Sequence, residues 1–176
     1  MAEIVYRDPI DKVIKTVDFD INNHSYKDMG ILIKSLLSSS TTPIGSKILC
    51  LDYHGVTDEF KEDDIISLTP IIVISFVGFY SQLRQPLRES LTKRIANDQI
   101  LFGVAVFKRT EEPGEKGTKE WIIKLINSLV PEVKLYFLDD SADHIKSVYS
   151  SKMKNVISQI VKSKQQVIQY IDKYTK

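Results

Sequence analysis

Four polar positions of the sequence follow apolar runs or a glycine-containing loop, and together they could do phosphate chemistry. Asp52, Ser75 and the acidic pair Asp139-Asp140 each end an apolar run, and Lys116 lies in a loop that opens a helix-like stretch. Carboxylates gathered at one point repel each other unless a cation joins them, and hard oxygen ligands favour Mg²⁺. A lysine and a hydroxyl would supply charge and hydrogen bonds to phosphate oxygens. A carboxylate could then attack phosphorus and form an acyl phosphate that water hydrolyses.

Four short apolar runs are expected to be the strands that position these groups. They are rich in β-branched residues and alternate with helix-like stretches, a pattern typical of strands buried on both faces of a parallel sheet. The runs are Lys47–Asp52, Ile71–Ser75, Ile100–Phe107 and Val133–Asp140. We therefore expect an α/β, Rossmann-like parallel sheet of about four to five strands flanked by helices, with right-handed crossovers. In such sheets ligands bind beyond the carboxyl ends of the strands, where the four polar positions would meet.

The remaining segments are expected to be helical. Apolar spacing predicts helices over Tyr26–Leu37, Pro86–Asn97 and Thr118–Leu129. The run Ser38–Pro43 ends the first of these, so we expect residues 1–45 to be a partly helical N-terminal extension and residues 46–146 to be the core. No Gly or Pro interrupts the helical period after Ser141. Residues 147–176 are therefore expected to form a long C-terminal helix that could lead into a further domain.

The composition narrows the possible classes of protein. The chain has 176 residues, of which 43% are hydrophobic and 27% charged, as in soluble globular domains. Its 24 basic and 23 acidic side chains give a net charge of +1, which offers no bulk attraction to nucleic acid or to an anionic membrane. The single Cys50 excludes a disulfide framework. We expect a monomer of the cytoplasmic type, with neither nucleic acid nor membrane as a partner.

The order of the motifs resembles that of the haloacid dehalogenase superfamily. The segment from Ile48 to Thr57, which contains Asp52-Tyr53-His54-Gly55-Val56, is similar to the first motif of that family. The segment Ile72–Ser75 looks like the second motif and Lys116-Gly117 like the third. The segment Phe137–Ile145, with its acidic pair, is similar to the fourth. The resemblance covers roughly residues 46–148 and implies a phosphatase that works through an aspartyl-phosphate.

This resemblance also implies roles for particular residues. Asp52 would be the nucleophile and a ligand of the cofactor Mg²⁺. Ser75 would bind the transferring phosphoryl group, and Lys116 would neutralise both the nucleophile and the phosphate. Lys108, which lies at a strand end, is the alternative to Lys116.

Further metal ligands follow from the same resemblance. Asp140 would bind Mg²⁺ directly, with Asp139 beside it or one water away, and the backbone carbonyl of His54 would be another ligand.

Two histidines depart from the family pattern. His54 stands where the phosphatases of the family have a second aspartate, and His144 replaces the last acid of the fourth motif. We hypothesise that His54 takes over proton transfer, because imidazole titrates near neutral pH. The alternative is that His54 packs in the turn and that activity is weak or absent.

The spacing of the motifs bears on the substrate. Too few residues separate Asp52 from Ser75, or Ser75 from Ile100, to hold a cap domain. An open, capless site suits a phosphate carried by a macromolecule, so a phosphorylated protein is the expected substrate, with phosphotyrosine preferred through stacking on Tyr53, Phe76, Phe79 and Tyr80. Two alternatives stay open, a small-molecule or nucleic-acid-end phosphatase and an inactive interaction module. A capless phosphatase ending in a free helix would also suit a bacterial protein delivered into a host cell.

Overall fold

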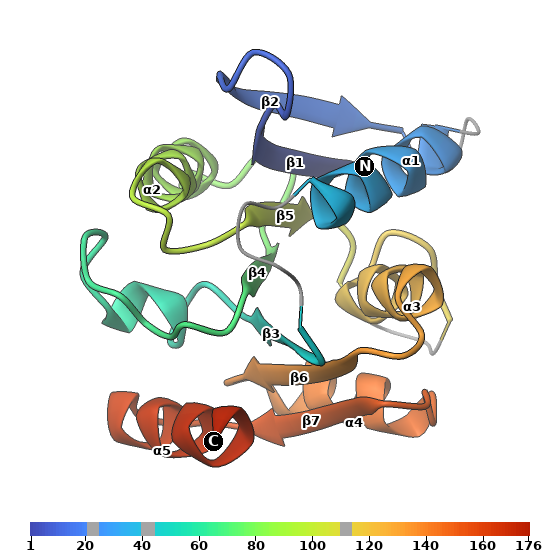
Figure 1. Ribbon diagram of the computed structural model, residues 1–176. Coiled ribbons are helices and arrows are strands. Elements are labelled where there is room, and N and C mark those ends of the chain that lie inside the picture. The colour runs from blue at the N-terminus through green and yellow to red at the C-terminus, as the bar shows by residue number, and fades with distance from the viewer. Residues whose placement is uncertain (21–24, 40–44, 110–113) are drawn as a thin grey trace.

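The structure, a computed structural model, describes residues 1–20, 25–39, 45–109 and 114–176, which form one seven-stranded sheet covered by helices on both faces (Figure 1). The strands are β1 (Ala2–Arg7), β2 (Ile14–Phe19), β3 (Lys47–Leu51), β4 (Ile71–Phe76), β5 (Phe102–Val106), β6 (Lys134–Asp139) and β7 (Val156–Ile160). The helices are α1 (Ser25–Ser38), α2 (Arg84–Ala96), α3 (Lys119–Leu129), α4 (Ala142–Ser150) and α5 (Lys164–Thr175), with a 3₁₀ turn, η1, at Thr57–Glu59.

The sheet is mostly parallel. Its strand order is β2-β1-β5-β4-β3-β6-β7, in which β3 to β7 run parallel, while β1 is antiparallel to β5 and β2 is antiparallel to β1. From β3 the chain builds outward through β4 and β5 on one side, and later through β6 and β7 on the other. The order therefore reverses between β3 and β6, and the carboxyl ends of strands at such a switch point are where open α/β sheets bind ligands.

Two hydrophobic cores hold the layers together. One face of the sheet packs against α1, α3 and α4 through residues such as Met29, Ile122 and Val148. The other face packs against α2 and α5 through residues such as Leu91 and Ile171. The central strands are buried on both faces, which explains why they are continuous apolar runs rather than alternating ones. The four expected strands correspond to β3, β4, β5 and β6, and the three expected helices to α1, α2 and α3, so these predictions are confirmed.

The N-terminal residues are part of the sheet, which corrects the expected extension at residues 1–45. Strand β1 pairs with β5 over five residues, from Ala2 opposite Val106 to Tyr6 opposite Phe102, and Ala2 and Ile4 are completely buried. The proposed boundary at Ser38–Pro43 lies in part outside the described residues. The sheet has seven strands, whereas four to five were expected. The additional strands are β1, β2 and β7.

The expected long C-terminal helix is also wrong. Two residues after α4, Lys152 and Asn155, have positive φ angles of 49° and 64°, which end the helix without a glycine. Residues 156–160 then form β7, which pairs in parallel with β6, and α5 follows and packs on the sheet. The apolar spacing of Val156, Ile157 and Ile160 fits a helix as well as a strand, so periodicity alone could not separate the two.

The connections around the centre of the sheet are short. Residues 52–70 hold only the turn η1 and irregular turns, and residues 77–101 hold α2. Both segments are described in full, and neither contains a separate domain, as expected. Within the described residues, no helix combines the length and the apolar character that crossing a membrane would need.

Candidate active site

Three carboxylates meet at the switch point of the sheet. Asp52 directly follows β3, Asp139 is the last residue of β6 and Asp140 follows it. One oxygen from each of the three lies within 4.8 Å of the others, so they could hold a metal ion together. Asp52 and Asp139 are only 5% and 0% exposed, and Asp140 is half-buried. Asp140 is therefore the most accessible of the three carboxylates.

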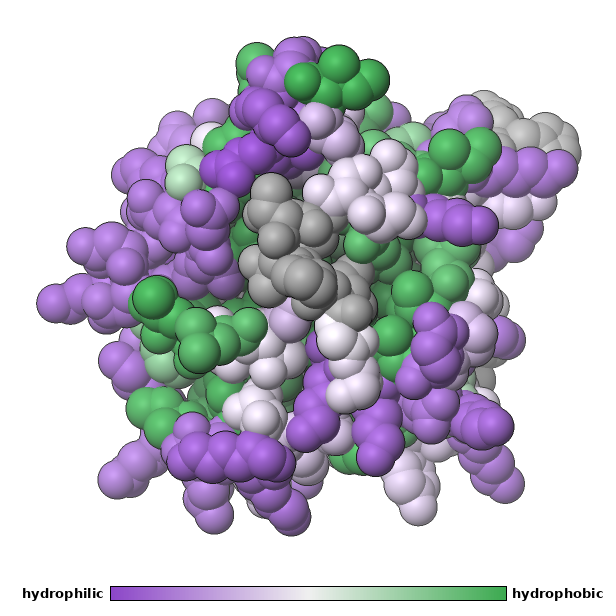
Figure 2. All heavy atoms as spheres, in the orientation of Figure 1, coloured by the Kyte–Doolittle hydropathy of each residue, from purple (hydrophilic) through white to green (hydrophobic). Residues whose placement is uncertain are grey.

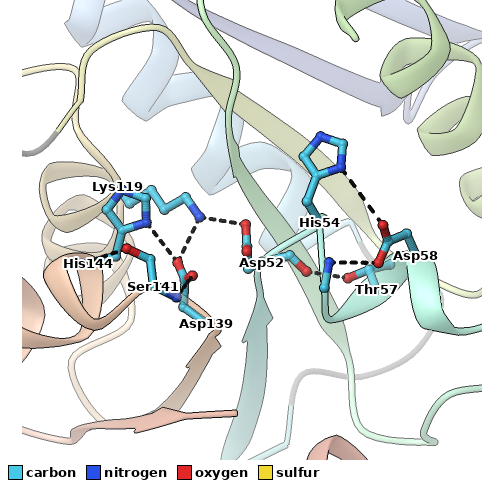
Figure 3. A network of polar contacts seen from close by, with 9 residues as sticks. Asp52, His54, Thr57, Asp58, Lys119, Asp139, Ser141 and His144 are labelled. Carbon is cyan, nitrogen blue, oxygen red and sulfur yellow. Dashed lines mark hydrogen bonds and ion pairs between the residues drawn. The ribbon is translucent and has the colours of Figure 1, made fainter. Parts of the chain in front are cut away.

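Lys119 is the cation of this site. Its ammonium lies 2.5 Å from Oδ1 of Asp52 and 2.7 Å from Oδ2 of Asp139, and its side chain is 2% exposed. Figure 3 shows this side chain reaching from α3 between the two carboxylates. Lys119 is the first residue of α3, directly after the N-cap residue Thr118, whose hydroxyl accepts a hydrogen bond from the backbone N–H of Trp121.

The neighbouring Glu120 fixes this end of α3. Its buried carboxylate accepts hydrogen bonds from the backbone N–H of Gly114 (2.8 Å) and from the hydroxyl of Ser147 on α4 (3.0 Å), and it also contacts the hydroxyl of Ser151. These bonds tie the first turn of α3 to α4 and to the loop before it. Lys119 is therefore held in place by two elements as well as by its own ion pairs.

The two aspartates that share Lys119 have opposite pKa shifts. Burial raises the pKa of Asp52 to about 8, because the charge of Asp139 and a hydrogen bond with Asp140 add to the effect of burial and outweigh the attraction of Lys119. Burial would also raise the pKa of Asp139, but the hydrogen bond from His144 and the charge of Lys119 hold that pKa well below its usual value. Asp139 is thus the stable anionic partner of Lys119, and Asp52 is a carboxyl that needs more positive charge nearby to ionise fully.

His144 supports Asp139. Its Nδ1 lies 3.1 Å from Oδ2 of Asp139, and the residue is 8% exposed. Ser141 caps α4 by accepting a hydrogen bond from the backbone N–H of His144, and the backbone N–H of Ser141 donates to Oδ1 of Asp139 at 2.9 Å. Both oxygens of Asp139 therefore have partners, which fixes the orientation of this carboxylate.

The loop after Asp52 packs closely against Asp140. Gly55 has a φ of 81°, and a Cβ atom at this position would lie 2.5 Å from Oδ2 of Asp140. Only glycine combines this backbone conformation with so close an approach. The backbone N–H and the hydroxyl of Thr57 both bind the carbonyl of Asp52, at 3.1 Å and 2.7 Å, which folds the loop back on the strand.

Helix α2 anchors the rest of this segment. The hydroxyl of Tyr53 donates to the hydroxyl of Ser90 at 2.7 Å. The buried guanidinium of Arg94 donates to the carbonyl of Phe60 (2.8 Å) and to Gln99 (2.6 Å). The loop that carries His54 and Gly55 is therefore held at both ends.

His54 lies next to the carboxylates in sequence but turns toward Asp58. Its Nδ1 is 3.8 Å from Oδ2 of Asp58, and its Nε2 is buried and has no hydrogen-bond partner among the residues that the structure describes. Figure 3 shows the ring on the opposite side of Asp52 from Lys119. The unpartnered Nε2 is compatible with proton transfer, but a bond to Asp52 is not part of the observed geometry.

Ser75 reaches the same edge of the sheet on a different face. It pairs in register with Ala105 and alternates with Ile74, so it points to the side that α2 covers, whereas Asp52 contacts Lys119 on the other side. The hydroxyl of Ser75 is fully buried and lacks a hydrogen-bond partner in the described part of the chain. The structure therefore does not bring Ser75 together with Asp52 and Lys119.

Lys116 and Lys108 are both displaced from the carboxylates by other contacts. Lys116 is exposed, and its ammonium lies 4.8 Å from the centre of the Tyr26 ring. Lys108 is paired with Glu115 at 3.5 Å. The position expected for Lys116 is taken by Lys119, three residues further on. The helical spacing could have predicted that Lys119 is buried. It precedes the buried Ile122 and Ile126 by three and seven residues and therefore lies on the same face of α3.

Comparisons with known proteins do not identify the chain. No family model, curated protein or solved structure matches it.

The charges of this geometry fit a divalent cation. Three carboxylates face one ammonium, so two formal negative charges remain when His144 is neutral. Asp139 and Asp140 both help to raise the pKa of Asp52, as the crowding of carboxyl groups does. An all-oxygen donor set of this kind is typical of Mg²⁺ sites.

Proposed function

We propose that the chain is a Mg²⁺-dependent phosphatase of the haloacid dehalogenase-like type, with Asp52 as nucleophile. The observation that carries the proposal is the meeting of Asp52, Lys119 and the Asp139-Asp140 pair at the switch point of a mostly parallel sheet. Perturbed, buried carboxyls at such a position are typical of functional sites.

In this reaction Asp52 would attack the phosphorus of a monoester. A bond forms between a carboxylate oxygen and phosphorus, the bond from phosphorus to the ester oxygen breaks, and the leaving oxygen takes a proton. Water then attacks the phosphorus of the aspartyl-phosphate, which releases phosphate and restores Asp52. Lys119, already 2.5 Å from Asp52, would stabilise the negative charge that builds up on the phosphoryl oxygens.

The remaining residues would hold the metal and move the proton. Asp52, Asp139 and Asp140, with the backbone carbonyl of His54, would bind Mg²⁺, which supplies positive charge to the phosphoryl group and to Asp52. The side chain of His54, whose Nε2 is unpartnered among the described residues, would protonate the leaving oxygen and then accept a proton from water. The role of Ser75 as a phosphate ligand would require a rearrangement of the end of β4.

The burial of the site favours a second candidate function. Asp52 and Asp139 are almost inaccessible, and both are paired with the ammonium of Lys119. A weakly active or inactive interaction module with this fold would share these features.

Phosphoproteins are the preferred substrates under the main proposal, because residues 52–70 and 77–101 contain no separate domain that could cover a metabolite. The free final helix that suggested delivery into a host cell is not present, since α5 packs on the sheet.

Hydrolysis of a generic aryl phosphate tests the proposal. We expect phosphate release that requires Mg²⁺, stops with EDTA and falls at least about a thousandfold in Asp52→Asn, since that variant lacks the nucleophile. Asp172→Asn is the matched control, because Asp172 is an exposed carboxylate on α5 whose side chain is 57% accessible. No hydrolysis by the wild-type protein would favour the interaction module, whereas equal rates for Asp52→Asn and Asp172→Asn would mean that Asp52 is not the nucleophile.

A further inference from the structure

Within the described residues, one long side of β7 has no neighbouring strand. β7 is the last strand in the order of the sheet, next to β6, and Figure 1 shows it at the lower end of the molecule. Its bonds to β6 use odd-numbered residues, since the carbonyl of Asn155 accepts from the N–H of Leu135 at 2.8 Å. At the other end, the N–H of Val161 donates to the carbonyl of Asp139 at 3.0 Å. Backbone groups alternate in direction along a strand, so the even-numbered residues of β7 direct theirs away from the sheet.

These outward backbone groups could pair with another strand. They are the N–H and C=O groups of Val156, Ser158 and Ile160. In the described part of the chain, only the carbonyl of Ile160 among them has a hydrogen-bond partner, the side-chain amide of Gln159 at 3.0 Å. A free edge of this kind recruits a further strand unless charged residues, proline or a bulge prevent it. β7 contains neither a charged residue nor proline.

β2, the strand at the opposite edge of the sheet, is different. Lys15 and Asp18 lie within it, and the ammonium of Lys15 is paired with Asp8 at 3.0 Å and with Asp11 at 2.8 Å. Charges within an edge strand disfavour pairing with another strand. β7 is therefore the edge that is open to a partner.

The segments that flank β7 are basic. Lys152 and Lys154 precede the strand, Lys162 and Lys164 follow it, and residues 151–171 contain no aspartate or glutamate. All four lysines are exposed. Figure 2 shows hydrophilic side chains along this end of the molecule. The uncharged edge of β7 thus lies between two pairs of cations.

The charge of these lysines is not balanced by ion pairs with the described residues. The ammonium of Lys162 donates to the backbone carbonyl of Asp140 at 2.6 Å, and that of Lys164 lies 5.2 Å from the centre of the Phe60 ring. The helices on the two faces of β7, α4 and α5, otherwise carry as many acidic as basic side chains, namely Asp143, Lys146, Asp172 and Lys173. The positive charge at both ends of β7 therefore remains available to a partner.

We propose that the free edge of β7 binds an extended segment of a partner protein that has an uncharged centre and acidic residues at both ends. The centre of the segment adds a strand to the sheet through hydrogen bonds with the outward backbone groups. Its acidic ends lie beside the lysines that flank β7. This inference does not depend on the proposed phosphatase function.

Charge and hydrogen bonding disfavour two other occupants. A second copy of this chain would bring four further lysines to the same edge, and like charges placed side by side repel each other. A nucleic acid would suit the lysines, but its backbone phosphates only accept hydrogen bonds. They leave the outward carbonyls of Val156 and Ser158 without donors, which a peptide backbone supplies.

Two synthetic peptides test the charge of the partner with the full-length protein. Both have a centre of alternating valine and threonine, flanked by glutamates in one and by lysines in the other. By fluorescence anisotropy at low salt, we expect the glutamate peptide to bind at least about tenfold more tightly. Lys154→Glu with Lys164→Glu should lower this ratio to below about two. Lys34→Glu with Lys124→Glu, at exposed lysines of α1 and α3, is the matched control and should keep it.

Ser158→Pro tests the backbone contacts. The N–H of Ser158 points away from β6, and proline is tolerated at such positions of an edge strand. The substitution removes the central outward donor, so we expect the affinity for the glutamate peptide to fall about tenfold or more. Circular dichroism checks that the variant is folded.

Amide hydrogen exchange in the wild-type protein gives a second measurement that needs no variant. The N–H groups of Val156, Ser158 and Ile160 should exchange quickly in the free protein and slowly with the glutamate peptide bound. The N–H groups of Ile157 and Gln159, which face β6, should be protected in both states.

Several results would overturn the inference. Equal affinities for the two peptides would remove the charge argument, and no binding of either peptide at about 1 mM would remove the docking site. Protection confined to residues outside β7 would place the peptide elsewhere. Self-association that Ser158→Pro abolishes would make this edge an interface between copies of the chain. Tighter binding of single-stranded DNA than of the glutamate peptide, lost in Lys154→Glu with Lys164→Glu, would assign the lysines to nucleic acid.

Discussion

Asp52 is the residue at which stability and the proposed chemistry oppose each other. Its carboxyl is 5% exposed, and burial raises its pKa to about 8. The folded protein therefore favours the protonated form, although nucleophilic attack needs the carboxylate. A carboxyl whose pKa is raised on folding destabilises the native state increasingly as the pH rises from the unfolded pKa to the folded pKa, and to the full extent at any higher pH. A residue retained at such a cost is more consistent with a functional role than with a structural one.

Asp52→Asn should stabilise the metal-free protein. The amide cannot ionise, so the penalty that Asp52 carries at pH 7 disappears, and we expect the free energy of unfolding to rise by on the order of 1 kcal/mol. The gain should be small near pH 4, where Asp52 is protonated in the folded state and about half protonated in the unfolded state. Urea unfolding at pH 4 and pH 7 in EDTA measures it, and added Mg²⁺ should stabilise the wild-type protein more than the variant. A variant less stable than wild type at pH 7 would mean that the ion pair with Lys119 outweighs burial.

Lys119 and Lys116 give a direct comparison between a buried and an exposed lysine three residues apart. We expect Lys119→Ala to lower aryl phosphate hydrolysis by about a hundredfold or more, because it removes the ammonium that faces both Asp52 and Asp139. Lys116→Ala, which removes the contact with the Tyr26 ring, should stay within about twofold of wild type. Steady-state kinetics of both variants, with circular dichroism to confirm folding, measure the difference. The reverse order of effects would restore Lys116 as the phosphate-binding lysine.

At the scale of single residues, the sequence predicts the anionic half of the site better than its cationic half. Asp52, Asp139 and Asp140 could be located because each ends an apolar strand, and parallel strands end at a common edge. To predict the lysine of the site, one must know where α3 begins. Lys119 is the first residue of α3 and is buried, whereas Lys116 lies three residues earlier and is exposed. Ser75 illustrates a related point, since a strand alternates its faces and one position along β4 changes the side of the sheet.

At the scale of elements, the turn after β3 decides whether Asp140 can reach Asp52. Gly55 adopts a φ of 81° and leaves no space for a Cβ beside the carboxylate of Asp140. We expect Gly55→Ala to push Asp140 away, to weaken Mg²⁺ binding by about tenfold or more and to lower hydrolysis accordingly. Isothermal titration of Mg²⁺ measures the affinity without relying on activity.

Gly114→Ala is the matched control for this turn. Gly114 has a similar φ of 83°, but no described residue lies within 4 Å of the position that its Cβ would take. It should therefore show the strain of the backbone without the clash at the metal site. Equal Mg²⁺ affinities for the two variants would mean that the contact between Gly55 and Asp140 does not shape the site.

The sequence predicts the strands that are buried on both faces of the sheet. It does not predict the strands at or near the edges of the sheet. Strands β3 to β6 are short continuous apolar runs that no helix pattern matches well. Strand β7 is an edge strand with a mixed sequence, and the break before it comes from left-handed Lys152 and Asn155, of which only asparagine commonly adopts this conformation. Strand β1 was not predicted, because its partner β5 lies about a hundred residues away in the sequence and the pairing exists only in the folded sheet.

At the scale of the whole molecule, one buried carboxylate joins the N-terminal hairpin to the rest of the protein. Glu3 on β1 is 1% exposed and binds Arg84 (3.0 Å) and Arg88 on α2. Burial alone would raise its pKa, but the hydrogen bonds from Arg88 and Arg84 outweigh this and hold the pKa below its usual value. Asp18 on β2 lies beside this cluster and has a raised pKa, because it is partly buried and faces the charge of Glu3.

Replacing Glu3 should therefore loosen the molecule in a pH-dependent way. A carboxyl whose pKa is lowered on folding contributes its full stability above the unfolded pKa and loses it as the pH falls through the folded pKa. In the Asp18→Asn background, which removes the coupled partner, Glu3→Gln should lower the free energy of unfolding by about 2 kcal/mol at pH 7 and by much less at pH 3. Urea unfolding across this range measures the difference. Glu132→Gln, at an exposed carboxylate, should change little at either pH. If Glu3→Gln were neutral at pH 7, the pairs with Arg84 and Arg88 would contribute no net stability, and the contacts of β1 with β5 alone would hold the N-terminal hairpin in place.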